Sequence, residues 1–122
     1  MRRSKAKTSS RSAELTYQGG LFVRALTRGS GKTAGSEGVD ITGMVRQIPT
    51  LPQTISIPGT VVVRAEIVLP KAHLPVINER RVAKGDEPFQ NCRNGVVAVK
   101  HFRNWYLADL LDVLAFDLLI LD

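Results

Sequence analysis

Two charged residues lie in the middle of an apolar stretch and are the first candidates for chemistry. Residues 61–71 read Val-Val-Val-Arg-Ala-Glu-Ile-Val-Leu-Pro-Lys, a β-branched run closed by a proline, which predicts a strand. Alternation places Arg64 and Glu66 on one face and leaves the opposite face apolar. Buried charges need each other or a polar ligand. The two residues therefore form either a structural ion pair or part of a ligand site.

A second candidate is the segment Asn91-Cys92-Arg93-Asn94, which follows Pro88-Phe89. Two amides around one guanidinium form a donor-rich cluster that suits a phosphate or ribose oxygen. The same composition also suits a plain turn, where Asn is favoured. The residues alone leave both interpretations open.

The segment Gly29-Ser30-Gly31-Lys32-Thr33 has part of a phosphate-binding P-loop pattern. The full pattern needs a glycine at position 26, which is Leu26, and residues 34–38 are unsuited to start the helix that would bind phosphate. His73 and His101 are far apart and have no carboxylates at ligand spacing. We therefore expect neither a P-loop nucleoside triphosphatase nor a metal site.

Length and charge predict one small domain with a basic arm. The 122 residues are 43% hydrophobic and carry a net charge of +6, and five of the 17 basic residues lie in residues 1–11, which contain no acid. We divide the chain into a flexible arm at 1–12 and a domain at 13–122. The arm could contact nucleic acid phosphates or be a solvated terminus.

The sequence predicts no membrane segment and a cytoplasmic location. The N-terminus lacks the apolar core of a signal peptide, and a single cysteine is compatible with a reducing compartment. The apolar stretch 110–121 is too short to span a bilayer and is interrupted by Asp112 and Asp117.

The expected fold class is α+β, an antiparallel sheet with one main helix. In the first half of the chain we expect strands at 13–17 and 21–26 around a Gln18-Gly19-Gly20 hairpin, a loop at 27–38, extended chain at 49–58 and the strand at 61–69. A helix should follow from 72 to 84 with Gly85 just after it, and then a loop at 86–94. Residues 95–102 could form either a strand or a helix, and a helical turn at 105–110 should lead into a buried strand at 111–121.

Several segments occur in a recognisable order: Thr27-Arg28-Gly29-Ser30-Gly31, residues 40–48, residues 63–71, Asn78-Glu79-Arg80-Arg81, Gly85-Asp86-Glu87-Pro88-Phe89 and Asn91-Cys92-Arg93-Asn94. Together they resemble the nucleotidyltransferase (adenylation) domain of NAD-dependent DNA ligases. The patterns of that family are T-R-G-D-G, D-I/V-T-x-N-V-R-x-I, V-R-G-E-V/I-x-M/L-P-K and N-E-x-R followed by G-x-x-x-F-x-N-P-R-N. The resemblance covers roughly residues 13–119 and implies a partial, ATP-grasp-like nucleotidyltransferase domain.

The resemblance implies a specific reaction. In that family a lysine attacks the α-phosphate of NAD, releases nicotinamide mononucleotide and becomes adenylated. The adenylate moves to the 5′-phosphate of a nick in duplex DNA, and the 3′-hydroxyl then closes the nick. Mg²⁺ is also needed for ligation, but the sequence shows no site for it.

The same resemblance implies a cofactor-binding set. Glu66 falls on the glutamate that holds the adenosine ribose, and Arg28 on the arginine of the loop near the nucleotide. Arg93 falls on the arginine next to the adenylate and the DNA phosphate. Arg64 joins the set because it shares a strand face with Glu66.

The implied DNA-binding set is Arg46, Lys100 and His101. His101 stands where the family has a second DNA-side arginine, eight residues after Arg93, and Lys100 is adjacent to it. Arg46 belongs to the D-I/V-T-x-N-V-R-x-I pattern.

The chain also departs from the family. The nucleophile of K-x-D-G falls on Lys7, ten residues before Tyr17, but the segment reads Lys-Thr-Ser-Ser. A lysine nucleophile must be deprotonated by its surroundings, which a basic flexible arm does not provide. Ser30 replaces an aspartate and Cys92 a proline. The later D-G-V/I-V-I/V-K motif does not occur in these residues.

Three hypotheses follow. The first is a fragment or split subunit of an NAD-dependent DNA ligase, inactive alone, which needs a second polypeptide with the remaining motifs. The second is a catalytically inactive, ligase-derived protein that binds nucleic acid or assembles through its apolar C-terminal strand. The third is an unrelated α+β domain. Whether the chain is itself an enzyme is left open by the residues.

Overall fold

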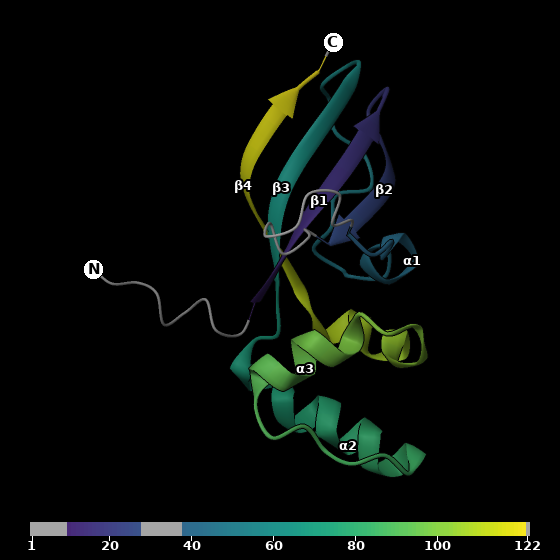
Figure 1. Cartoon of the computed structure of the whole chain (residues 1–122), viewed down its shortest axis with the longest axis vertical. Coiled ribbons are helices and arrows are strands. Elements are labelled where there is room, and N and C mark those ends of the chain that lie inside the picture. Colours follow the sequence, from purple (N-terminus) through teal and green to yellow (C-terminus); the bar gives the residue numbers. More distant parts are fainter. Residues whose placement is uncertain (1–9, 28–37, 122) are drawn as a thin grey trace, which may run out of the picture.

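The computed structural model describes residues 10–27 and 38–121, and these form an antiparallel sheet with helices gathered at one end of it (Figure 1). The four strands lie in the order β2-β1-β3-β4. Their bounds are β1 (Ser10–Gln18), β2 (Leu21–Thr27), β3 (Thr60–Val68) and β4 (Asp112–Ile120). The helices are α1 (Thr42–Val45), α2 (Leu74–Lys84) and α3 (Cys92–Val99), with 3₁₀ turns η2 (Lys71–His73) and η3 (Phe102–Leu110). The α+β class and the antiparallel sheet are confirmed.

The predicted hairpin joins β1 to β2 through a two-residue turn. Gly19 and Gly20 have φ angles of 59° and 84°, as a type I′ turn requires of both central residues. A Cβ on Gly20 would lie 2.7 Å from the carbonyl oxygen of Ile55, so glycine is needed there for space as well.

β3 is the central strand and has the predicted alternation. Its neighbours are β1 and β4, both antiparallel. The face predicted to be apolar is buried, from Val61 to Leu69, whereas the face that carries Arg64 and Glu66 is half-buried. The half-buried side chains of this second face, called the open face below, are partly accessible to ligands.

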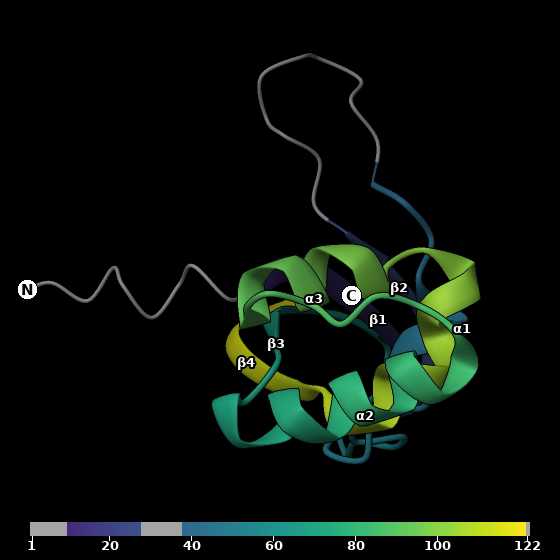
Figure 2. The same cartoon turned by 90° about the horizontal axis from the view of Figure 1, so that it is seen from below.

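The helical end contains a second helix, α3, most of which lies in a stretch that the sequence left open between strand and helix. α2 ends at Gly85, whose φ of 94° is the expected left-handed cap. The expectation of one main helix and of a loop to residue 94 is wrong, because α3 begins at Cys92. The Asn91 side chain accepts a hydrogen bond from the Asn94 amide at 2.8 Å and so caps that helix. Figure 1 shows α3 and α2 below the sheet, and Figure 2, which looks from that end, shows both helices in front of the strands.

The last strand is in the predicted place but is not buried. β4 pairs with β3 along one edge, yet Leu114, Phe116 and Ile120 are more than half exposed. The expectation of a buried strand is therefore wrong, because the described residues partly cover only Asp112 and Val113 at the start of β4. Residues 49–59 cross the core face of the sheet beside β4. The Tyr17 hydroxyl donates to the Pro52 carbonyl of this segment at 2.7 Å.

An apolar groove lies between this crossing segment and β4. Its volume is about 280 Å³, and its walls include Leu15, Ile55, Val63 and Leu118. The core face of the sheet is thus closed by helices at one end and open along β4.

Candidate functional site

The open face of β3 carries the two charged residues singled out by the sequence, and each is paired across to β1. The Ser12 hydroxyl donates to Glu66 Oε2 at 3.0 Å. Arg64 Nε lies 3.8 Å from Glu14 Oε2. The Arg64 side chain is 35% exposed and the Glu14 side chain 41%. Arg64 and Glu66 are therefore not paired with each other, which rules out the first of the two interpretations left open by the sequence, a structural ion pair.

Arg64 is only partly satisfied by its neighbours. Its Nε–H is buried and has no hydrogen-bond partner among the described residues. In the strand register Glu14 lies opposite Arg64 on one side and Asp117 on the other. A buried donor without an acceptor costs free energy, so the neighbours of Arg64 leave part of its hydrogen-bonding capacity unused.

This face has the chemistry to hold a sugar hydroxyl. The Glu66 carboxylate is held by Ser12 on a strand rather than a loop, which fixes its position. A carboxylate with lone pairs directed to an open face accepts hydrogen bonds from vicinal hydroxyl groups. Arg64 beside it supplies a guanidinium that is already partly desolvated.

Cationic side chains mark both ends of α3. Arg93 is exposed in the first turn, two residues after the capping Asn91. Lys100 ends the helix, and its carbonyl accepts a hydrogen bond from Trp105 Nε1 at 3.2 Å. Seven helical residues span about 10 Å, close to the spacing of a few phosphates along one strand of DNA.

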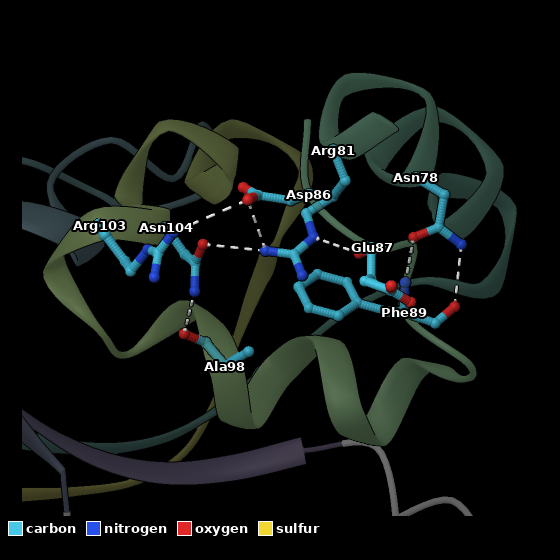
Figure 3. A network of polar contacts seen from close by, with 8 residues as sticks. All are labelled: Asn78, Arg81, Asp86, Glu87, Phe89, Ala98, Arg103 and Asn104. Carbon is cyan, nitrogen blue, oxygen red and sulfur yellow. Dashed lines mark hydrogen bonds and ion pairs between the residues drawn. The ribbon is translucent and has the colours of Figure 1, made fainter. Parts of the chain in front are cut away.

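A polar network lies between α2, the segment 86–91 and η3 (Figure 3). Arg81 is at its centre and is only 14% exposed. Its Nε donates to the Glu87 carbonyl at 2.9 Å, and its Nη1 donates to Asn104 Oδ1 at 3.1 Å. Its guanidinium stacks 4.1 Å from the centre of the Phe89 ring. The cleft beside it, about 560 Å³, is lined by Arg81, Asp86, Glu87, His101, Arg103 and Asn104.

The segment that resembles D-I/V-T has a structural role in addition to carrying Arg46. Asp40 Oδ1 accepts from the backbone amide and the hydroxyl of Thr42, at 2.9 and 2.6 Å. These hydrogen bonds lower the pKa of Asp40. The Thr42 hydroxyl oxygen accepts from the Ala25 amide at 3.0 Å, which ties α1 to β2. Arg46 is exposed at the end of α1, 5.0 Å above the Phe22 ring.

The structure groups the predicted site residues as follows. Lys7 and Arg28 lie outside the described residues. Arg64 and Glu66 share the open sheet face, Arg93, Lys100 and His101 lie on or next to α3, and Arg46 lies on α1. No hydrogen bond or ion pair joins Glu66 to Arg93 within ranges 10–27 and 38–121. Their convergence on one nucleotide stays a prediction.

The sequence reasoning did not assign several polar residues that organise these regions. Ser12 and Glu14 are the partners of Glu66 and Arg64, and the period of two in β1 was the available signal. Asn78, Arg81 and Asn104 build the network of Figure 3. The spacing of three residues within the N-E-R-R segment places Asn78 and Arg81 on one helix face.

Two searches gave negative results for the described part of the chain. It contains no group of three or more His, Cys, Asp or Glu residues placed to hold a metal ion. Nor does it contain a helix with the length and apolar character needed to cross a bilayer.

Comparison with known proteins gave consistent matches. The sequence model of the family described as "NAD-dependent DNA ligase adenylation domain" matches residues 4–104. A DNA ligase of Levilactobacillus brevis is 46% identical over 80 residues, which cover 66% of this chain and 11% of that protein. A DNA ligase of Halothermothrix orenii is 42% identical over 83 residues, and one of Haloferax volcanii is 41% identical over 85, each covering 68% of this chain and 12% of the relative. The chain thus spans about an eighth or less of these relatives.

Proposed function

The chain belongs to the family of NAD-dependent DNA ligase adenylation domains, and we propose that it supplies one part of the adenylate pocket of such a ligase. It would act as a fragment or split subunit together with a second polypeptide that carries the remaining motifs. The observation that carries this proposal is the open face of β3, where Glu66 is held by Ser12 beside a partly unsatisfied Arg64.

In this proposal NAD is bound through its adenosine half. Glu66 would accept from the ribose hydroxyls, and Arg64, Arg28 and Arg93 would balance the charge of the phosphates. The bound dinucleotide supplies the activated adenylate. Lys7 is the proposed nucleophile by its place in the family pattern, and we assign no Mg²⁺ ligand to this chain.

The second polypeptide would cover the apolar groove and β4. Leu118 and Ile120 are 43% and 57% exposed on the face that continues the core. Large exposed apolar patches mark interaction surfaces or cause aggregation, and an uncovered strand edge can pair with another chain. A covering segment would complete the core and add the missing side of the pocket.

The proposed substrate is nicked duplex DNA, contacted by Arg46, Lys100 and His101. The basic residues of the arm at 1–12 would add sequence-independent phosphate contacts. We also propose that the protein acts in the cytoplasm.

The test of the proposal is transfer of labelled adenylate from NAD to the chain. We would incubate the chain with NAD labelled in its adenylate, alone and with a ligase polypeptide that contains the D-G-V/I-V-I/V-K motif. Protein-bound label should appear only in the mixture and disappear in Lys7→Ala, whereas the matched variant Lys5→Ala should keep it. Glu66→Gln should lower labelling about 10- to 100-fold, the effect of a lost charge-assisted hydrogen bond. No label under any condition would refute the catalytic proposal.

A second function, an inactive nucleic-acid-binding or assembly protein, is favoured by one observation. Residues 7–10 read Lys-Thr-Ser-Ser where the family has K-x-D-G. Its test is the salt dependence of affinity for nicked duplex, with and without residues 1–12. If the arm contacts DNA, its loss should reduce the slope of log K against log salt by roughly 1 per lost phosphate contact. An unchanged slope would exclude the arm as a DNA contact.

A further inference from the structure

The segment between α2 and α3 is held from both sides before it reaches Arg93. We propose that Asn78 and Arg81 of α2 are positioning residues that fix the start of α3 and thereby aim Arg93. This inference rests on the proposed role of Arg93 at the adenylate and the DNA phosphate. It adds a role for two side chains that themselves contact no substrate.

The Asn78 side chain forms hydrogen bonds with both the amide and the carbonyl of the Phe89 backbone. The Phe89 amide donates to Asn78 Oδ1 at 2.7 Å, and Asn78 Nδ2 donates to the Phe89 carbonyl at 3.0 Å (Figure 3). Such a two-point contact fixes both the position and the orientation of the peptide. Phe89 is two residues before Asn91, which caps α3, so Asn78 sets where the helix begins.

Arg81 holds the same segment from the side and links it to the other end of α3. It donates to the Glu87 carbonyl and stacks on the Phe89 ring. Through Nη1 it also binds Asn104, a side chain only 6% exposed. Asn104 Nδ2 in turn donates to the Ala98 carbonyl at 2.9 Å, within α3 itself. α3 is therefore tied to Arg81 near both of its ends.

Arg93 depends on this support because its own side chain is exposed. It lies in the first turn of α3, and the direction in which it leaves the helix follows the backbone there. Groups that bind phosphates or reacting atoms must be held within about 0.5 Å of the productive position by supporting contacts. Loss of the clamp formed by Asn78 and Arg81 would leave Arg93 present but not aimed.

The neighbouring residue offers a matched control. Arg80 donates to both oxygens of Asp109, at 2.6 and 2.9 Å, and to the Tyr106 carbonyl at 3.3 Å. It therefore makes a comparable set of contacts from the same helix, but to η3 and not to the segment 86–91. Arg80→Ala and Arg81→Ala remove the same charge from adjacent positions and differ in which segment they release.

The first arm of the test measures order without any ligand. In the intact chain we expect backbone order parameters near 0.85 for the amides of residues 91–93. They should fall toward about 0.6 in Arg81→Ala and in Asn78→Ala, and stay at the intact value in Arg80→Ala. If Arg81→Ala does not fold, Asn78→Ala decides. Unchanged order in a folded clamp variant, or equal loss in Arg80→Ala, would overturn the inference.

The second arm measures affinity for nicked duplex at fixed salt. Arg93→Ala should weaken binding about 10-fold in the intact chain and in the Arg80→Ala background, but less than about 3-fold in the Arg81→Ala background. An equal effect in all three backgrounds would overturn the clamp. If Arg93→Ala has no effect in the intact chain, the proposed role of Arg93 fails, and the order parameters still decide whether the clamp exists.

Discussion

Gly43 is the position where a single methyl group should have the most diagnostic effect on stability. It lies in α1, where Gly→Ala would ordinarily stabilise a helix by up to about 1 kcal/mol. A Cβ at Gly43, however, would lie 2.6 Å from Cζ3 of Trp105 and 3.3 Å from its Cε3. Carbon atoms pack at about 3.5–4.0 Å, so the indole must retreat by roughly 1 Å.

The indole has little freedom to move, because Trp105 Nε1 donates to the Lys100 carbonyl and the ring meets Phe102 edge-on. Inserting a methylene into such packing typically costs about 1–3 kcal/mol. After the helix gain is subtracted, we expect Gly43→Ala to lower the free energy of unfolding by about 1–2 kcal/mol. Urea unfolding followed by far-ultraviolet circular dichroism measures this loss.

A double-mutant cycle with Trp105→Phe tests the stated cause. Phenylalanine is smaller than the indole and lacks part of the six-membered ring that Gly43 faces. In the Trp105→Phe background, Gly43→Ala should therefore lower the free energy of unfolding by less than about 0.5 kcal/mol. Each variant is compared with its own parent, which cancels the separate cost of Trp105→Phe. An equal loss in both backgrounds, or a gain in the parent chain, would show that the approach of Trp105 does not determine the choice of glycine.

Two further predictions concern charge and the exposed strand. Hydrogen bonds from Arg80 lower the pKa of Asp109 below its ordinary value of 3.8, so the stabilisation they give is present above that pH and is lost as pH falls through the folded-state pKa. Because the Arg80–Asp109 pair is partly exposed, Asp109→Asn should lower the free energy of unfolding by less than about 1 kcal/mol at pH 7. Urea unfolding measures this loss, and an equal loss near pH 3 would contradict the pH dependence. Leu118 faces the groove, so Leu118→Lys should abolish complementation by the second polypeptide. Leu119 lies on the opposite face, so Leu119→Lys should preserve complementation. Equal effects of the two variants in a pull-down with the partner would refute the groove as the docking surface.

The elements that were predicted correctly are those whose signals are local. The strand around Arg64 and Glu66 has an alternating pattern and a closing proline, and β3 forms there. The end of α2 is encoded by Gly85, because a left-handed cap favours glycine whatever the surroundings. The family itself was also recognisable, because several short motifs keep their order and spacing along the chain.

Helix α3 shows how local propensity can mislead, because the sequence left its second half open between strand and helix and predicted a loop at its start. The valines of α3 favour a strand, and the asparagines before them favour a turn. The residues that α3 buries are Cys92, Gly95, Val96 and Val99, a spacing of three, one and three that is helical. The pattern was therefore present, but its polar start was interpreted as a loop when Asn91 is in fact the cap.

The partners of the charged residues were beyond sequence reasoning for a different reason. Alternation showed that Arg64 and Glu66 share a face, but the register with β1 decides that Glu14 and Ser12 are their neighbours. Register depends on tertiary packing and on the turn at residues 19–20, neither of which a strand pattern contains. A site on a sheet can thus be placed on the correct face from sequence, while its hydrogen bonds cannot.

β4 joins these two arguments to the proposed function. Its apolar sequence predicted burial, and the strand forms, yet its side chains stay exposed because burial depends on what packs against a strand. Leu118 and Ile120, on the groove side of β4, are each roughly half exposed, so about 100 Å² apiece, or some 200 Å² in all, would be removed from water by a cover. At 25 cal/mol per Å² this corresponds to an upper limit of about 5 kcal/mol, before the entropic cost of association. A gain of that order would stabilise the folded chain at the same time as its adenylate pocket is completed, so complementation should raise thermal stability and adenylate transfer together.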